Sequence, residues 1–281
     1  MKRRLFAAIA CILLCLAVLP GTASADTGPK PAVTITVVNA PAGEYYLDLL
    51  ITGPGDYENI DPADYDPALI AGLKSWEGEG WYPALVEGTS APLFGDLTPG
   101  ADGAHRFSYF GLPDTFRIAV SGPDGAQATE EAFTRTVFYT RLTYDWQSNS
   151  ITRATSPAGF YAVQFLSTLL PTLVVEGLLL FAFGFRARRD WLVFLLTNLA
   201  TQAGLHLWIG SGAMAAGSHP LYYLLLMVAE APILLVELLV YIFLLKEHGK
   251  GRRALYALCA NAASYAAGFL PLHLAVQFLR A

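Results

Sequence analysis

Four long apolar runs fill the second half of the chain, and they constrain the fold more than any other feature. Each run is long enough to cross a bilayer as an α-helix, because about 20 apolar residues span its hydrocarbon core. The runs occupy residues 159–185, 191–209, 220–245 and 254–279. We therefore predict an α-helical four-transmembrane bundle over residues 159–281.

The N-terminus has the pattern of a secretory signal peptide. Three basic residues at positions 2–4 precede an apolar stretch over residues 5–19, and the sequence Ala-Ser-Ala follows at 23–25. A basic start, an apolar centre and a pair of small residues are typical of a segment that signal peptidase removes. We predict a signal peptide over residues 1–25, and a retained N-terminal helix is the alternative.

Residues 26–152 predict a β-rich, sandwich-like extracytoplasmic domain. Apolar residues alternate with threonines over Val33–Val37, and a Pro-Gly turn leads into Tyr45–Ile51, so we predict a hairpin from these two runs. The motif Gly122-Pro-Asp-Gly125 predicts a further turn between strands. One helix interrupts the strands, with Asp66 as its N-cap and a proline at the first helical position.

The predicted domain is acidic and lies close to the first apolar run. Residues 26–158 hold 18 acidic and 7 basic side chains, a net charge of −11. Binding to phosphates needs clustered lysine and arginine, so we exclude nucleic acid as a partner. The linker, residues 153–158, is too short to let the domain tumble freely.

The links between the apolar runs predict the orientation of the bundle. The first and third links, residues 186–190 and 246–253, hold seven lysines and arginines between them, whereas the second holds none. The positive-inside rule places both basic links in the cytoplasm. The N-terminal domain and the C-terminus then lie outside, which agrees with a signal peptide. We predict a multi-pass protein of the cell membrane.

Polar side chains recur at one level of the four runs. Glu176, Asn198, Glu237 and Asn261 lie seven to nine residues from the cytoplasmic end of their runs, which is about 10–14 Å deep. Ionisable residues inside a membrane are costly, so they are the first place to look for function. Helical spacing extends each position into a polar stripe. The candidate cluster contains Glu176, Asn198, Gln202, Glu230, Glu237, Asn261 and Ser264.

Three interpretations of this cluster remain open. Its side chains fix the bundle by interhelical hydrogen bonds, or they bind a cation, a proton or a polar substrate between two carboxylates. The third interpretation is intramembrane catalysis, which needs a metal or an activated nucleophile. His206 and His273 lie nearer the outer face and do not complete such a site. We assign no catalytic residue, no metal ligand and no cofactor.

Two motifs of the soluble half are set aside. Glu130–Arg135 matches the E-E-x-x-x-R motif of CAAX-type membrane proteases, but it lies outside the apolar runs, so we predict a solvated edge. Residues 56–66 are rich in the oxygen ligands that calcium prefers, but they lack the spacing of an EF-hand. We predict that this stretch is an acidic loop ending in a helix cap.

The segments Phe116–Gly125, Glu176–Arg186 and Thr197–Gln202 resemble those of a group of uncharacterised bacterial membrane proteins. The resemblance implies a signal peptide, an external β domain and four C-terminal transmembrane helices, and it brings no activity. We expect a non-enzymatic membrane protein whose external domain binds or senses a ligand or partner. The alternatives are a small transporter or ion-coupled protein that uses Glu176 and Glu237, and an intramembrane enzyme. The expected partners are the lipid bilayer, a protein partner or second copy of the chain, and a cell-envelope ligand.

Overall fold

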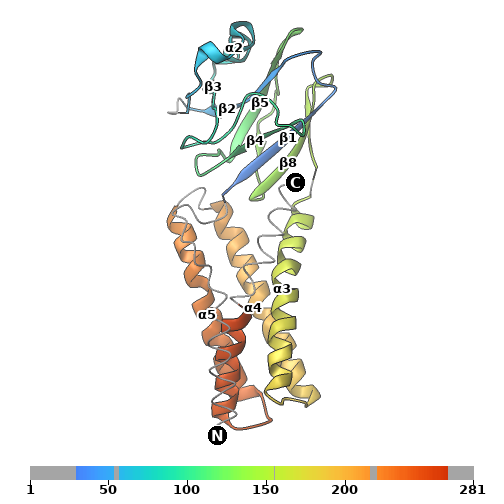
Figure 1. Cartoon of the computed structure of the whole chain (residues 1–281), viewed down its shortest axis with the longest axis vertical. Helices are drawn as coiled ribbons and strands as arrows, with labels where there is room; N and C mark the ends of the chain where they lie inside the picture. The colour runs from blue at the N-terminus through green and yellow to red at the C-terminus, as the bar shows by residue number, and fades with distance from the viewer. Residues whose placement is uncertain (1–29, 54–56, 155, 216–219, 265–281) are drawn as a thin grey trace. The chain divides into compact units, whose positions relative to one another are not determined.

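The structure is a computed structural model that forms two compact units, one mainly from Pro29–Pro157 and the other from the helices that follow. Figure 1 shows strands in the first unit and long helices in the second. The structure describes residues 30–53, 57–154, 156–215 and 220–264. Side chains are described at these positions except 209–230. The predicted signal peptide, the end of the predicted fourth span and the side chain of Glu230 lie outside this description.

The first unit contains two β-sheets. One has four strands in the order β4-β1-β8-β9, and the other has the order β3-β2-β5-β6 with β7 beside β5. Strand β1 runs antiparallel to β4 and parallel to β8. The strands are β1 (Ala32–Val38), β2 (Tyr46–Thr52), β3 (Trp81–Pro83), β4 (Ala104–Ser108), β5 (Thr115–Gly122), β6 (Gly125–Ala128), β7 (Phe133–Thr134), β8 (Tyr139–Asp145) and β9 (Ser150–Arg153).

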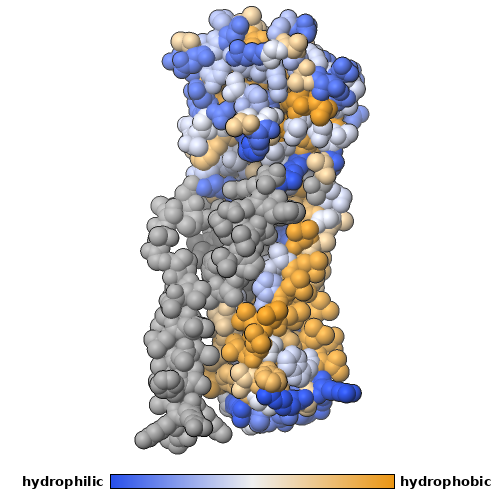
Figure 2. All heavy atoms as spheres, turned by 45° about the vertical axis from the view of Figure 1, so that its right-hand side comes forward, coloured by the Kyte–Doolittle hydropathy of each residue, from blue (hydrophilic) through white to orange (hydrophobic). Residues whose placement is uncertain are grey.

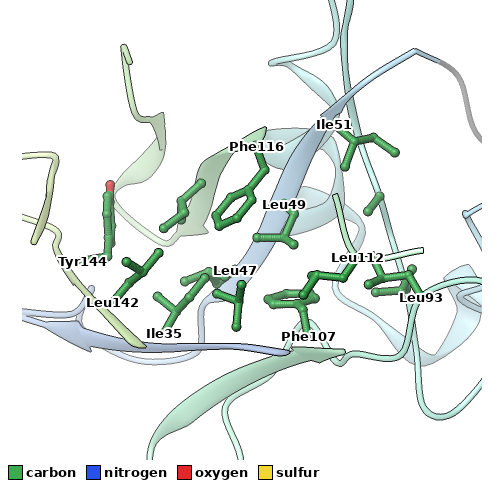
Figure 3. Packing of buried hydrophobic residues seen from close by; sticks show 14 of the residues in the cluster. Ile35, Leu47, Leu49, Ile51, Leu93, Phe107, Leu112, Phe116, Leu142 and Tyr144 are labelled. Carbon is green, nitrogen blue, oxygen red and sulfur yellow. The ribbon is translucent and has the colours of Figure 1, made fainter. Parts of the chain in front are cut away.

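A cluster of buried apolar side chains joins the two sheets face to face. Alternate residues of a strand point to the same side of its sheet. Ile35 of β1 and Leu142 of β8 face the cluster from the first sheet. Leu47 of β2 and Phe116 of β5 come from the other, and Figure 3 shows these side chains pointing toward one another. The predicted β-rich N-terminal half is therefore confirmed, with its main core between two sheets.

Helix α2 (Pro67–Lys74) covers the other face of the second sheet. The Asp66 side chain accepts a hydrogen bond from the Ala68 backbone N–H at 2.7 Å, as the capping pattern predicts. Leu69 and Leu73 pack there against Tyr46 and other buried residues of a second apolar cluster. Strand β2 is consequently buried on both faces. The predicted helix cap at the end of the acidic loop is confirmed.

The predicted hairpin between Val33–Val37 and Tyr45–Ile51 is wrong. The first run is β1 and pairs with β4 and β8, whereas the second is β2 and pairs with β3 and β5 in the other sheet. Alternation indicates that a run is a half-buried strand, but it does not identify the partner strand. The predicted turn over Gly122–Gly125 is confirmed, because it joins β5 to β6 as a hairpin.

The second unit is helical. It contains α3 (Pro157–Ala182), α4 (Arg188–Ala215), α5 (Pro220–Leu244) and a helical stretch over residues 250–264. Gly184, with φ of +88°, follows the end of α3, where the Phe185 N–H donates to the Leu180 carbonyl. Among the residues described, α3 is the helix long and apolar enough to cross a membrane, and Ala231–Leu244 forms a shorter apolar helix.

The described helices bury polar side chains and expose apolar ones. On α3, Leu170, Val174 and Leu178 are 55–67% exposed, while Glu176 on another face is 1% exposed. Figure 2 shows apolar side chains along the described helices and hydrophilic ones at the end of this unit. The interior of this unit also contains buried apolar side chains such as Leu180, so the unit differs from a water-soluble bundle in its apolar outer face.

Asp48 and His105 are buried titratable side chains of the first unit with opposite pH effects. Burial raises the pKa of Asp48 to about 7, although backbone N–H groups of Leu85 and Leu49 donate to its carboxyl group. Burial also lowers the pKa of His105 to about 4, which the backbone at Asp96 only partly opposes. The folded chain therefore holds a proton on Asp48, and lacks one on His105, at pH values where the unfolded chain does the reverse.

We expect these two groups to cancel in the parent protein between about pH 4 and 6.5. Stability from Asp48 is full below pH 3.8 and is lost as the pH rises to about 7, whereas stability from His105 is full above pH 6.5 and is lost toward pH 4. The free energy of unfolding should fall with rising pH in His105→Leu and rise in Asp48→Asn, by up to about 1.4 kcal/mol per pH unit. Denaturant unfolding of the first unit at pH 4.5 and 6.5 checks this. Slopes of the same sign in both variants would contradict it.

Candidate functional site in the helical unit

Glu176 lies on α3 with its carboxyl group buried among three helices. Its Oε2 accepts a hydrogen bond from Asn198 Nδ2 of α4 at 3.1 Å. Its Oε1 accepts one from Ser264 Oγ of the 250–264 helix at 2.8 Å. Because Asn198 is fully buried and Glu176 almost fully so, these bonds lie in the interior of the unit.

Glu237 on α5 is bound in a corresponding way. Its Oε1 accepts a hydrogen bond from Thr201 Oγ1 of α4 at 2.7 Å, and its Oε2 accepts one from Asn261 Nδ2 at 2.9 Å. The side chain is 2% exposed. Both donors are neutral. Each of the two glutamates therefore has one amide donor and one hydroxyl donor, and α4 and the 250–264 helix contact both acids.

Two tyrosines extend this network. Asn198 Nδ2 also lies 2.9 Å from the Tyr241 hydroxyl oxygen, and the Tyr256 hydroxyl donates to the backbone carbonyl of Glu176 at 3.4 Å. The two tyrosine rings lie 5.3 Å apart, inside an apolar cluster with Phe185 and Leu245. The phenol groups and the acids thus belong to one buried polar cluster.

The structure brings together most of the cluster that the sequence predicts. Gln202 is buried one turn from Asn198, but its side-chain oxygen makes no hydrogen bond to a described residue. Glu230 cannot be compared, because its side chain is not described. Thr201 and Tyr256 were missed by the sequence analysis. The predicted residues that the hydrogen bonds join are Glu176, Asn198, Glu237, Asn261 and Ser264.

A sequence repeat underlies this geometry and is the signal that would have identified Thr201. Pro171–Glu176 and Pro232–Glu237 share the pattern Pro-x-Leu-x-Val-Glu, and Asn198–Thr201 and Asn261–Ser264 share Asn-x-Ala-Thr/Ser. Each glutamate binds the asparagine of its own helix pair and the hydroxyl of the other pair. The two helical hairpins are therefore related by an approximate twofold exchange.

The links of the two hairpins interlock in the same reciprocal way. Asp190 accepts hydrogen bonds from the backbone N–H groups of Lys246 and Glu247 at 2.9 and 3.0 Å. The Glu247 carboxylate accepts bonds from the Ala187 and Arg186 backbone N–H groups, which lower the pKa of Glu247. The ends of α3 and α5 therefore lie side by side, so these two helices run in the same direction.

We expect Asp190→Ala to lower the stability of the helical unit by about 2–3 kcal/mol, because a buried carboxylate that binds two N–H groups is lost. Asp190 is fully buried, whereas its neighbour Arg189 is exposed. Arg189→Ala is therefore the matched control and should change stability by less than about 0.5 kcal/mol. Thermal unfolding of the purified protein in detergent measures both. Equal effects of the two variants would show that the interlock contributes little.

The first unit contains a separate cavity of about 460 Å³. Residues 129–133 and 148–151 line it, and Glu130 is exposed beside the half-buried Phe133. The prediction of a solvated edge over Glu130–Arg135 is wrong for Arg135, which is 4% exposed and pairs with Asp114 at 2.6 Å. The arginine also donates to the Pro113 carbonyl, so it fixes the loop at that edge.

The described residues include no group of three or more histidine, cysteine, aspartate or glutamate side chains placed to hold a metal ion. The polar cluster consists of two carboxyl groups with amide and hydroxyl donors. This arrangement can hold the helices together through hydrogen bonds, or it can hold positive charge between the two acids. Comparison of the chain with protein-family models, with curated proteins and with solved structures found no match.

Proposed function

We propose that the chain is a multi-pass protein of the cell membrane, with spans over residues 159–185, 191–209, 220–245 and 254–279. The apolar outer face of α3 and its buried Glu176 support a lipid environment. The β domain and the C-terminus lie outside, and the links 186–190 and 246–253 lie in the cytoplasm. Exposed Arg186, Arg188 and Lys250 on these links support this orientation.

Within this architecture, we propose that the helical unit is ion-coupled and takes up positive charge at Glu176 and Glu237. The observation that carries the proposal is the pair of buried carboxyl groups bound by neutral donors from the same two helices. A buried carboxylate costs several kcal/mol unless positive charge compensates it. Glu237 has two neutral donors, so binding of a cation or a proton lowers the energy of the site.

Ion flux into liposomes that contain the purified full chain tests this proposal. We expect Glu176→Gln and Glu237→Gln each to reduce the flux at least about tenfold, since each removes one of the two charges. Glu77→Gln, which changes an exposed carboxyl group of the first unit outside the cavity, is the matched control and should leave the flux unchanged. Thermal unfolding confirms that each variant is folded. Parental flux in both folded glutamate variants would remove this function.

The cavity beside Glu130 and Phe133 favours a second function, binding of a ligand or partner by the external domain. The Phe133 ring already lies against the Arg153 guanidinium, so the exposed Glu130 and Glu131 carboxyl groups of the lining are the groups that suit a positively charged ligand. Thermal shifts of the full chain with cell-envelope fragments test this function. We expect Glu130→Gln combined with Glu131→Gln to abolish any shift and Glu58→Gln, which lies outside the cavity, to preserve it. No shift with any fragment would leave the domain without this role.

A further inference from the structure

Each buried glutamate has one donor whose role is fixed. Asn198 Nδ2 lies 3.2 Å from the Phe194 carbonyl as well as near Glu176, and Asn261 Nδ2 lies 3.1 Å from the Ala257 carbonyl. A carbonyl oxygen requires a donor, so these contacts hold each amide with its NH₂ group toward the carboxyl group. The Oε2 atom of each glutamate therefore faces an N–H group in every protonation state.

The other donor of each glutamate is a hydroxyl with a second acceptor within reach. Ser264 Oγ lies 2.8 Å from Glu176 Oε1 and 3.2 Å from the Asn261 carbonyl oxygen. Thr201 Oγ1 lies 2.7 Å from Glu237 Oε1, and 3.0 and 3.2 Å from the carbonyl oxygens of Thr197 and Asn198. A hydroxyl rotates its single hydrogen and also accepts hydrogen bonds. Each one can donate to a carboxylate, or accept from a carboxylic acid and donate to its own helix.

We propose that Glu176 and Glu237 are two matched protonation sites, and that Ser264 and Thr201 are positioning residues that accommodate both protonation states. This inference rests on the proposed ion-coupled function and names the proton as the ion. A hydronium ion gives its proton to Oε1, which forms an O–H bond and leaves a water molecule, and the neighbouring hydroxyl turns its hydrogen to a backbone carbonyl. Release reverses both steps. The carboxyl group gains or loses one unit of charge, and no heavy atom has to move.

The same contacts favour a proton over a metal ion. A hard metal ion such as Ca²⁺ takes 6–8 oxygen ligands through free lone pairs. Here an N–H or O–H hydrogen points at every carboxyl oxygen of Glu237, and such hydrogens repel a cation. A proton needs only one lone pair and one acceptor, and Thr201 supplies the acceptor.

The surroundings of the two acids are specified by each helix that packs on them. Among the described residues, the titratable groups near the acids are the other glutamate, Tyr241 on α5 and Tyr256 on the 250–264 helix. Helix α4 presents Asn198, Thr201 and Gln202, and its His206 bonds instead to the Gln202 backbone and to Thr168 of α3. No arginine or lysine forms an ion pair with Glu237 among these residues. The titratable groups that face each acid are therefore the other acid and the two phenols.

Infrared difference spectroscopy of the full chain in lipid, recorded as a function of pH, tests the proposal. A buried protonated carboxyl group gives its own C=O stretching band, and we expect one band to disappear in Glu176→Gln and another in Glu237→Gln. Thr201→Val should raise the midpoint pH of the Glu237 band by about one unit, because a hydrogen bond to a charged group is worth more than one to a neutral group. Ser264→Ala should do the same for the Glu176 band.

Matched variants separate this role from a purely structural one. Thr201→Ser keeps the hydroxyl and should have the parental midpoint. If Thr201 acted through packing alone, Thr201→Val would also have the parental midpoint. Ser167→Ala removes a hydroxyl that donates to the Gln164 carbonyl of its own helix, its one partner among the described side chains and backbone groups, and should change neither band. If a glutamate variant fails to fold, the threonine and serine variants still give the two midpoints.

Three results would overturn the inference. These are the absence of any titrating carboxyl band, midpoints that Thr201→Val and Ser264→Ala leave unchanged, and midpoints that shift when choline replaces Na⁺. The last result would assign the site to a metal cation, and it would support the ion-coupled function while removing the proton. Titrating bands without ion flux would have the opposite meaning, since the protonation sites would stand and the ion-coupled function would fall.

Discussion

Replacing Asn198 with leucine is expected to destabilise the helical unit by about 3 kcal/mol. The two hydrogens of the Asn198 NH₂ group lie within reach of three acceptors, the Glu176 carboxyl group, the Tyr241 hydroxyl oxygen and the Phe194 carbonyl, so the variant leaves buried polar atoms without a donor. Two of these contacts, to Glu176 and Tyr241, join α4 to other helices, and interhelical bonds of about 0.6 kcal/mol each would give only about 1 kcal/mol. Leaving a buried polar group without its partner costs about 1–3 kcal/mol, and more if the group is charged, so a larger loss would indicate a charged Glu176.

The double variant Asn198→Leu, Glu176→Gln isolates this coupling. Unfolding in mixed detergent gives the four free energies of the double-mutant cycle, and we expect an interaction energy of about 1 kcal/mol or more. Leu199→Ala is the control on the same helix, because Leu199 is 43% exposed. Additive effects of the two substitutions would mean that the asparagine stabilises α4 without stabilising the acid.

Phe107→Ala is expected to lower the stability of the first unit by about 3–5 kcal/mol. Phe107 of β4 is fully buried in the cluster between the sheets. Its surroundings are close packed, since a Cβ atom added to Gly95 would lie 2.5 Å from the Phe107 ring. The core therefore has little freedom to collapse into the space that the ring leaves.

Hydrogen exchange of the β1 and β4 amides in the full chain measures this loss, because these strands open only with the sheet. Val38→Ala, at the 39% exposed end of β1, is the control and should cost less than about 1 kcal/mol. Equal exchange rates in Phe107→Ala and the parent protein would show that the core between the sheets does not limit stability.

Local signals predicted local structure, and they could not predict pairings between distant segments. Asp66 and the proline after it predicted α2, and Gly122–Gly125 predicted the β5–β6 hairpin, because caps and tight turns involve neighbouring residues. The hairpin of β1 and β2 was wrong because sheet partners depend on contacts far along the chain. Strand β2, buried on both faces, also gave no clean alternation to identify its neighbours.

The polar cluster was predictable because the level of a residue can be counted from the end of its apolar run. Equal distances from the basic links placed Glu176, Asn198, Glu237 and Asn261 at one level, and the hydrogen bonds join them. The level of a residue along a helix does not specify how the helix is rotated. The sequence therefore could not show that Thr201 binds Glu237 while the Gln202 oxygen binds no described residue.

The parallel pairing of β1 with β8 has a consequence for the order in which the protein is made. Ala32 lies opposite Tyr139, so the first strand of the unit has its second neighbour only after most of the unit has been synthesised. Until then, one edge of β1 carries unpaired backbone groups, which can pair with other chains. Helix α3 begins at Pro157, only a few residues beyond β9. The closing of this sheet and the emergence of the first apolar helix therefore fall within the same short interval of synthesis, when the nascent chain is most open to mispairing.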